Sequence, residues 1–178
     1  DRRILLGYRN TIIYTFFGTL LAVFITVPAA YALSRKDFVG GVVLMRLMVF
    51  TMYFSGGMIP TYLVVKSLGL VDTPYVLMII GSFSVFNLIL CRTYFQNTIP
   101  KELQDAAEVD GCSTGRFFFS IVIPLSKAII AIMVLYYAVY RWNSFFSALI
   151  YVSKAELYPL QLIMRDILVQ GQNLQADI

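Results

Sequence analysis

The chain has 178 residues, of which 59% are hydrophobic and 13% charged, and its formal net charge is +4. A soluble domain contains about 25% charged residues, so this chain has about half the usual share. The sequence contains no histidine, which excludes histidine zinc sites, Ser-His-Asp triads and histidine proton relays. It also lacks the GxxxxGK[ST] pattern of a nucleotide-binding P-loop.

The charged residues are distributed unevenly along the chain. Four long apolar stretches are Thr11–Leu33, Leu47–Val65, Thr73–Cys91 and Ala128–Ser153, and only the last contains a charge, Arg141. Each is close to the ~20 residues that a helix needs to cross a bilayer. The sequence therefore predicts an all-α membrane protein with spans at about 11–33, 44–65, 73–91 and 126–152, and it excludes a soluble fold. The basic flanks are expected to meet lipid headgroups rather than nucleic acid.

Local signals refine these spans. Pro60 predicts a kink in the second span, because proline removes one backbone hydrogen bond. Asp72 or Thr73 is predicted to cap the third span, with Pro74 in its first turn. Cys91 and Cys112 are too few for a disulfide framework and are expected to be free thiols. The absence of an initial Met suggests a piece of a longer membrane protein.

One sizeable polar segment lies between the third and fourth spans, at residues 92–124. Thr98 is predicted to cap a helix over Lys101–Val109, with Pro100 in its first turn. Gly111 suits a left-handed C-terminal cap, and Ser113 or Thr114 is predicted to cap a second helix that runs to Pro124. The segment thus favours a helix–turn–helix at the membrane surface, with a plain solvated loop as the alternative. Lys and Arg are too evenly divided between the two sides to decide which side faces the cytoplasm.

The same polar segment carries a family motif. Asp105-Ala106-Ala107, three residues, Gly111, nine residues and Ile121-Val122-Ile123-Pro124 resemble the "EAA" signature of permease subunits of binding-protein-dependent ABC importers. That signature reads E-A-A, three residues, G, nine residues, I-x-L-P, so Asp105 and Ile123 are the departures. Further segments resemble the carbohydrate, maltose-type branch, and residues 54–62 are typical of its oligosaccharide subgroup. These segments are Arg9-Asn10-Thr11, Ala29–Arg35, Phe54–Tyr62, Leu68–Thr73 and Trp142–Tyr151.

The resemblance implies an architecture. Family members usually have six transmembrane helices, so this chain would be a single transmembrane domain, residues 1–178, containing four of them. The 92–124 segment would be cytoplasmic, and residues 98–124 within it would couple the permease to its ATPase. The coupling residues implied are Glu102, Asp105, Ala106, Ala107, Asp110, Gly111 and Pro124.

The resemblance also implies partners and a place in the cell. The chain would be a multi-pass protein of the bacterial inner membrane, with a second permease, two ATPase subunits and an extracytoplasmic solute-binding protein as partners. It would not be an enzyme and would bind no metal or cofactor, because ATP and Mg²⁺ bind to the ATPase. Candidate substrate-pathway residues, each with a structural role as the alternative, are Tyr53, Asn87, Tyr137, Trp142 and Asn143.

Two other classes of membrane protein were weighed. An ion- or proton-coupled carrier or channel usually needs carboxylates or histidine within the membrane, and the predicted spans contain no Asp, Glu or His. An intramembrane protease needs a base beside its serine, or an Asp pair, and no such residues lie in the spans. An importer permease that transports a sugar, neutral or acidic, is therefore the leading hypothesis.

Overall fold

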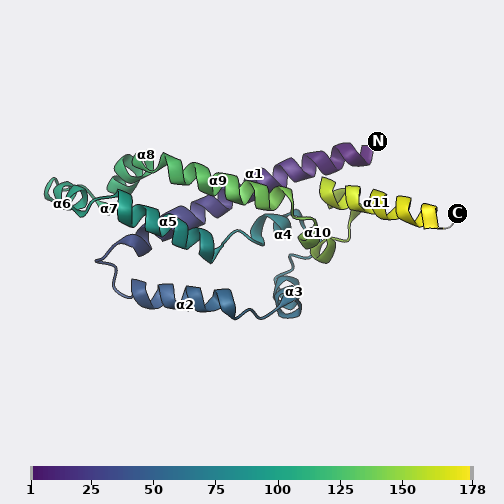
Figure 1. Ribbon diagram of the computed structural model, residues 1–178, viewed down its shortest axis with the longest axis horizontal. Coiled ribbons are helices and arrows are strands. Elements are labelled where there is room, and N and C mark those ends of the chain that lie inside the picture. The colour runs from purple at the N-terminus through teal and green to yellow at the C-terminus, as the bar shows by residue number, and fades with distance from the viewer. Residues whose placement is uncertain (1, 177–178) are drawn as a thin grey trace. The chain divides into compact units, whose positions relative to one another are not determined.

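The computed structural model describes the backbone of residues 2–176 and the side chains of residues 2–169. The described chain is helical throughout and contains no strand (Figure 1). Its helices, in order, are α1 (Arg2–Ser34), α2 (Gly41–Tyr53), α3 (Met58–Ser67), α4 (Pro74–Ile79), α5 (Val85–Thr98), α6 (Lys101–Val109), α7 (Thr114–Phe117), the π-helix η1 (Phe118–Val122), α8 (Ile123–Leu125), α9 (Lys127–Trp142), α10 (Phe145–Tyr151), the 3-10 helix η2 (Ala155–Leu157) and α11 (Leu160–Ala176).

The predicted spans differ in how continuous they are. Only α1 is by itself long and apolar enough to cross a membrane, and the described residues contain up to three spans if interrupted helix pairs are counted. One such pair is α2 with α3, and the other joins residues 114–125 to α9 with a bend of 80°. The other predicted spans are interrupted at residues 54–57, 80–84 and 143–144.

Local chemistry explains these interruptions. Gly57 and Gly81 both have positive φ, 85° and 75°, which glycine adopts without steric cost. The second predicted span is bent, but the break lies at residues 54–57, directly before Pro60, which lies in the first turn of α3. At the third interruption, Asn143 Nδ2 donates to the Val139 carbonyl (2.8 Å) and Ser144 Oγ donates to the Arg141 carbonyl (2.8 Å).

The chain forms two compact units. Unit 1 comprises residues 1–22, 56–82 and 136–178, and unit 2 comprises residues 23–55 and 83–135. In unit 1, the N-terminal part of α1 holds the segment that precedes α11. Asn10 Nδ2 donates to the Glu156 carbonyl (2.7 Å), and Tyr14 Oη donates to the Leu157 carbonyl (3.1 Å).

The start of α4 is held differently from what the sequence predicts. Thr73 precedes Pro74 at the helix start, but no side chain caps the helix. Thr73 Oγ1 donates instead to the Leu70 carbonyl (2.6 Å), and Asp72 accepts from the Ser153 amide. The predicted side-chain cap is therefore wrong, because Asp72 ties together two loops of unit 1.

Unit 2 holds the polar segment against an apolar core. This core contains Tyr31 of α1, Cys91 and Phe95 of α5, Phe118 of η1 and Met133 of α9. Tyr31 lies edge-on to Phe95, with ring centroids 5.8 Å apart, and 5.0 Å from Phe118. Arg92 Nε also donates to the Leu33 carbonyl (2.8 Å), so the C-terminal turn of α1 is fixed to α5. Both cysteines are free, as predicted.

Candidate functional site

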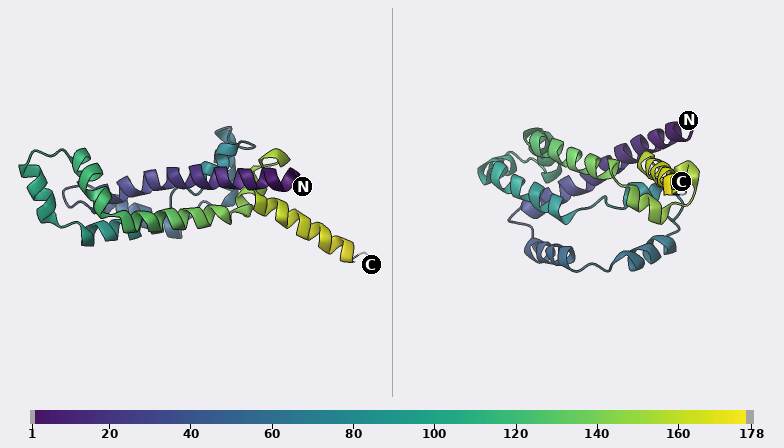
Figure 2. Two further views of the ribbon diagram at one scale, coloured as in Figure 1. Left: turned by 90° about the horizontal axis from the view of Figure 1, so that it is seen from above. Right: turned by 45° about the vertical axis from the view of Figure 1, so that its right-hand side comes forward.

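The segment between α5 and α9 contains two helical arms. Figure 2 shows α6 and the α7–α8 segment as a hairpin at one end of unit 2. The predicted Thr98 cap is wrong: Thr98 is the last residue of α5, and Pro100 precedes α6 without a side-chain cap. The predicted Ser113 cap is confirmed, since its hydroxyl accepts from the Arg116 amide at 3.4 Å.

Gly111 makes the turn between the two arms. Its φ is +71°, as its place after the helix predicts. The Cys112 amide donates to the Ala107 carbonyl (2.9 Å) and the Gly111 amide to the Glu108 carbonyl (3.0 Å). These two bonds form a Schellman motif, in which a left-handed residue lets the chain reverse and satisfy the last helical carbonyls. The turn therefore has a specific backbone geometry that sets how the second arm leaves the first.

The second arm is not a regular α-helix. α7 leads into a π-helical turn, η1, followed by α8, which contains Pro124. Phe117, Phe118 and Val122 are buried in the core of unit 2, whereas Phe119 is 69% exposed. π-helical turns are rare and often occur at functional sites. Here the wider turn places Phe117 and Phe118 together on the core side.

The two alanines of the motif, Ala106 and Ala107, differ in burial. Ala107 is 9% exposed and belongs to the core of unit 2, which Leu103 also contacts. Ala106 is exposed, as are the other predicted coupling residues: Glu102, Asp105, Asp110, Gly111 and Pro124. Val109 completes this face and is 88% exposed. α6 is therefore anchored through Leu103 and Ala107 and presents Ala106, among carboxylates, outward.

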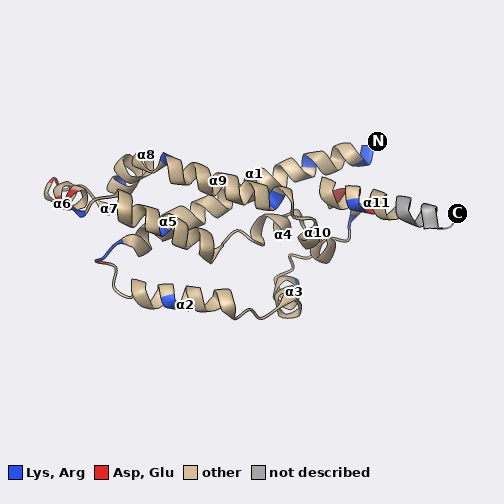
Figure 3. Cartoon of the chain, in the orientation of Figure 1, with Lys and Arg blue, Asp and Glu red and all other residues tan. Residues whose placement is uncertain are grey.

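Acidic residues of unit 2 gather on and after α6, as Figure 3 shows. Glu108 accepts from Gln104 Nε2 (3.0 Å) and lies 3.5 Å from Arg35 Nη2. Arg35 also donates to Asp37 through Nε (2.9 Å) and Nη2 (2.5 Å). These hydrogen bonds hold the pKa of the Asp37 carboxyl below its usual range and raise the pKa of Arg35. An ion-paired cluster therefore joins the end of α1 to α6.

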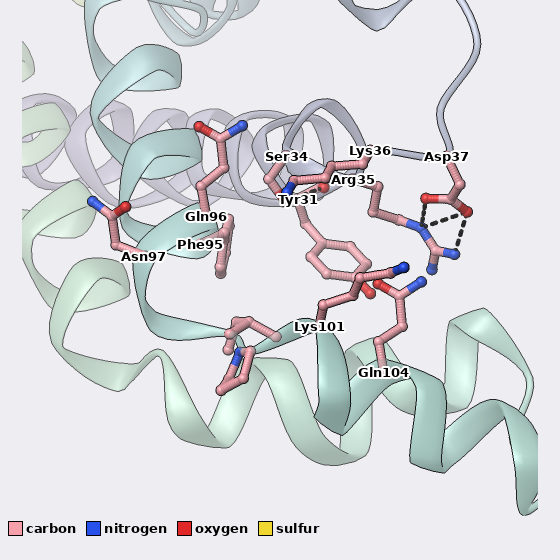
Figure 4. Close-up of a pocket in the computed structure, with 12 residues that line it drawn as sticks. Tyr31, Ser34, Arg35, Lys36, Asp37, Phe95, Gln96, Asn97, Lys101 and Gln104 are labelled. Carbon is pink, nitrogen blue, oxygen red and sulfur yellow. Dashed lines mark hydrogen bonds and ion pairs between the residues drawn. The ribbon is translucent and has the colours of Figure 1, made fainter.

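A hollow of about 360 Å³ lies beside this cluster (Figure 4). Side chains from the end of α1, the end of α5 and the start of α6 line it, including Arg35, Lys36, Asp37, Lys101 and Gln104. Its basic and acidic groups partly neutralise each other. Neither here nor elsewhere in the described chain do three His, Cys, Asp or Glu side chains gather as metal ligands would.

The candidate pathway residues differ in exposure. In unit 2, Tyr53 is 80% exposed and Asn87 is buried. In unit 1, Tyr137 is buried, Trp142 lies edge-on to Tyr8 with centroids 6.0 Å apart, and Asn143 is exposed. Trp142 and Asn143 thus have partners within unit 1, Tyr8 and the Val139 carbonyl.

Sequence reasoning did not single out Arg141 as a site residue. Its guanidinium is buried, and it donates to the Leu77 carbonyl (2.7 Å) and to Ser82 Oγ (2.7 Å). Gly18 makes room for it, because a Cβ there would lie 2.4–2.5 Å from guanidinium atoms. Arg141 is the lone charge in a long apolar stretch, and that was the available signal. It supplies donors to backbone and side-chain oxygens where α4 ends.

Comparison with known proteins assigns the chain. Residues 4–168 match the family described as "Binding-protein-dependent transport system inner membrane component". The chain belongs to that family. The resemblance based on the spacing of the Asp105-Ala106-Ala107 motif is therefore confirmed, and the match favours the ABC-importer hypothesis over an ion-coupled carrier or an intramembrane protease.

Two relatives of this permease-family chain come from Bacillus subtilis. It is 44% identical over 168 residues to the polygalacturonan/rhamnogalacturonan transport system permease protein YtcP of Bacillus subtilis, covering 94% of this chain and 58% of the relative. It is 45% identical over 159 residues to protein LplC of the same organism, covering 89% and 54%.

A solved structure of similar fold is a bacterial ABC transporter involved in the import of the acidic polysaccharide alginate. The TM-score is 0.90 and the identity 36%, over 93% of this chain and 59% of that chain. The present chain thus spans between half and three fifths of the length of these relatives.

Proposed function

We propose that the full protein is a permease subunit of an ATP-driven importer and forms half of a transmembrane pathway for an oligosaccharide. The family match supports this proposal, as do relatives that transport polygalacturonan, rhamnogalacturonan or alginate. The partners are a second permease, two ATPase subunits and an extracytoplasmic solute-binding protein. ATP and Mg²⁺ bind to the ATPase, and this chain catalyses no reaction.

The observation that supports the coupling role is that one face of α6 packs on the core of unit 2 while the other face is exposed. Leu103 and Ala107 hold the helix to the core of unit 2, while Ala106 is exposed beside Glu102 and Asp105. A small residue lets another backbone approach closely, and carboxylates bind Arg or Lys in a partner groove. ATP-driven closure is a rigid-body motion, which needs a docked element of this kind to reach the membrane helices. The ATPase therefore contacts the exposed face of α6, together with Asp110, Gly111 and Pro124.

Two single-cysteine variants, compared with each other, test this contact. In the full complex with Cys91→Ala and Cys112→Ser, Ala106→Cys should cross-link to the ATPase, with a yield that changes with nucleotide. Ala107→Cys is the matched control, because its side chain lies in the core of the same helix and should cross-link at least tenfold less. Equal yields at both positions, or none at 106, would contradict the docking face.

The proposal includes a topology. The single transmembrane domain has its four spans at about 11–33, 44–65, 73–91 and 126–152. The 35–37 turn and the 92–124 segment, with its two helical arms, are cytoplasmic, and residues 66–72 and 153–158 face outward. Cysteine accessibility in right-side-out vesicles tests this: an impermeant maleimide should label Lys154→Cys and should label Lys36→Cys only after permeabilisation.

The substrate pathway involves Tyr53, Asn87, Tyr137, Trp142 and Asn143, because aromatic faces and amides suit sugar rings and hydroxyls. Transport by the reconstituted complex with its binding protein tests the substrate class. Oligogalacturonate should be imported with ATP hydrolysis, whereas a maltodextrin of equal length should be a poor substrate.

A further inference from the structure

We propose that a second hollow in unit 2, between α2 and α5, binds an anionic phospholipid. This hollow has a volume of about 300 Å³, and it is lined by Val42, Met45, Arg46 and Val49 of α2 and by Arg92 of α5. Three apolar side chains and two guanidinium groups thus line one depression on a membrane protein (Figure 1 shows the two helices).

The two guanidinium groups give the hollow its charge. Arg92 is fixed by its Nε bond to the Leu33 carbonyl (2.8 Å), which leaves its terminal nitrogens to serve another acceptor. Arg46 lies in the second turn of α2, where it is the helix's lone charged residue. Neither arginine forms an ion pair with a carboxylate anywhere in the described chain. A phosphodiester complements this arrangement, because guanidinium groups bind phosphate oxygens bidentately.

The apolar lining favours a lipid over a soluble anion. Val42, Met45 and Val49 occupy the α2 side of the hollow, and no residue of α2 is buried by the rest of the described chain. By contrast, the hollow beside Arg35 contains Asp37 and several amides, which suit water and small polar solutes. An acyl chain covers aliphatic and methionine side chains, while the headgroup phosphate meets the two arginines.

The position along the chain matches a bilayer surface. Arg46 follows the 35–37 turn closely, and Arg92 lies beside the end of α1 through Leu33. Basic sites between membrane helices at the cytoplasmic face bind anionic headgroups. The assignment to the inner leaflet rests on the proposed topology, whereas the binding of the lipid itself does not.

Lipid retention by the purified importer complex tests the proposal. The complex is equilibrated with equal amounts of phosphatidylglycerol and phosphatidylcholine, and retained lipid is measured by native mass spectrometry. The Arg46→Gln/Arg92→Gln double variant should lose the preference for phosphatidylglycerol by about tenfold. Arg116→Gln, on an exposed arginine outside the hollow, is the matched control and should keep it.

A second variant distinguishes a lipid from other occupants. Val49→Trp fills the hollow while retaining both arginines, so it should also reduce retention of phosphatidylglycerol. Millimolar inorganic phosphate should not displace the lipid; displacement together with normal retention by Val49→Trp would show a simple phosphate site and overturn the proposal. Cross-linking of Arg46→Cys to a protein subunit would overturn it as well, by showing that protein covers the hollow. Because retention is read without transport or ATP, failure of the proposed substrate class or coupling role would leave this measurement unaffected.

Discussion

The turn at Gly111 offers the sharpest test of coupling. The residue has φ of +71°, and a Cβ built there would meet no heavy atom within 4 Å. Gly111→Val therefore introduces backbone strain without a steric clash. The strain opposes the two turn bonds, from Cys112 to Ala107 and from Gly111 to Glu108.

The magnitude follows from the left-handed conformation. An L-residue pays roughly 1–2 kcal/mol in that region, and a β-branched residue lies at the upper end. A cost of one to two kcal/mol lowers the ratio of native to distorted turn by a factor of roughly 5–30. Asparagine tolerates the same region better, so Gly111→Asn should have a much smaller effect.

The assay is transport and ATP hydrolysis by the complex reconstituted with its binding protein. The Gly111→Val complex should assemble and hydrolyse ATP, but the amount of sugar imported per ATP should fall, by at most the factor by which the ratio of native to distorted turn falls. Gly115→Val is the control, because Gly115 lies in α7 with open space around it and without a positive φ. Normal coupling in Gly111→Val, or equal uncoupling in Gly115→Val, would refute the reasoning from backbone geometry.

Three further predictions concern packing and charge. Gly18→Ala should displace the Arg141 guanidinium and deprive the Leu77 carbonyl and Ser82 of a donor, lowering stability by about 2–4 kcal/mol; a thermal midpoint equal to that of Gly115→Ala would contradict it. Ala22 is 0% exposed, so Ala22→Leu should destabilise the chain itself by about 1–3 kcal/mol, whereas Ala29→Leu, at a half-buried position, should mainly weaken subunit assembly; gel filtration and thermal melting separate the two effects. Arg35 lowers the pKa of Asp37, so the ion pair between them should persist as pH falls through the ordinary Asp range and should be lost only as pH falls through the lowered pKa. Arg35→Gln should raise the pKa of Asp37, as measured by carboxyl ¹³C NMR. An unchanged titration would show that the ion pair does not set the pKa.

The amino-acid sequence alone determined the features that depend on neighbouring residues. Apolar runs without charge predicted a helical membrane protein, because bilayer thickness and hydropathy act on local composition. The spacing from Asp105 to Pro124 identified the family, and Gly111 indicated a positive φ, because only glycine adopts it freely. The Ser113 cap could also be predicted from local sequence, because a capping side chain bonds to a backbone amide only three residues away.

Tertiary structure decided which faces are buried and where helices break. Ala106 and Ala107 are adjacent alanines, yet Ala106 is exposed and Ala107 is in the core. Which alanine is buried depends on the rotation of α6 about its axis, and the packing of the helix against the core of unit 2 sets that rotation. Thr98 and Asp72 have side chains that commonly cap helices, but neither caps one here. Thr98 is the last residue of α5, and Asp72 accepts a hydrogen bond from the Ser153 amide. The hydrogen-bond partners of Arg141 are the Leu77 carbonyl and Ser82 Oγ, which are distant in sequence. A buried charge needs such acceptors, and only the folded chain brings them to the guanidinium.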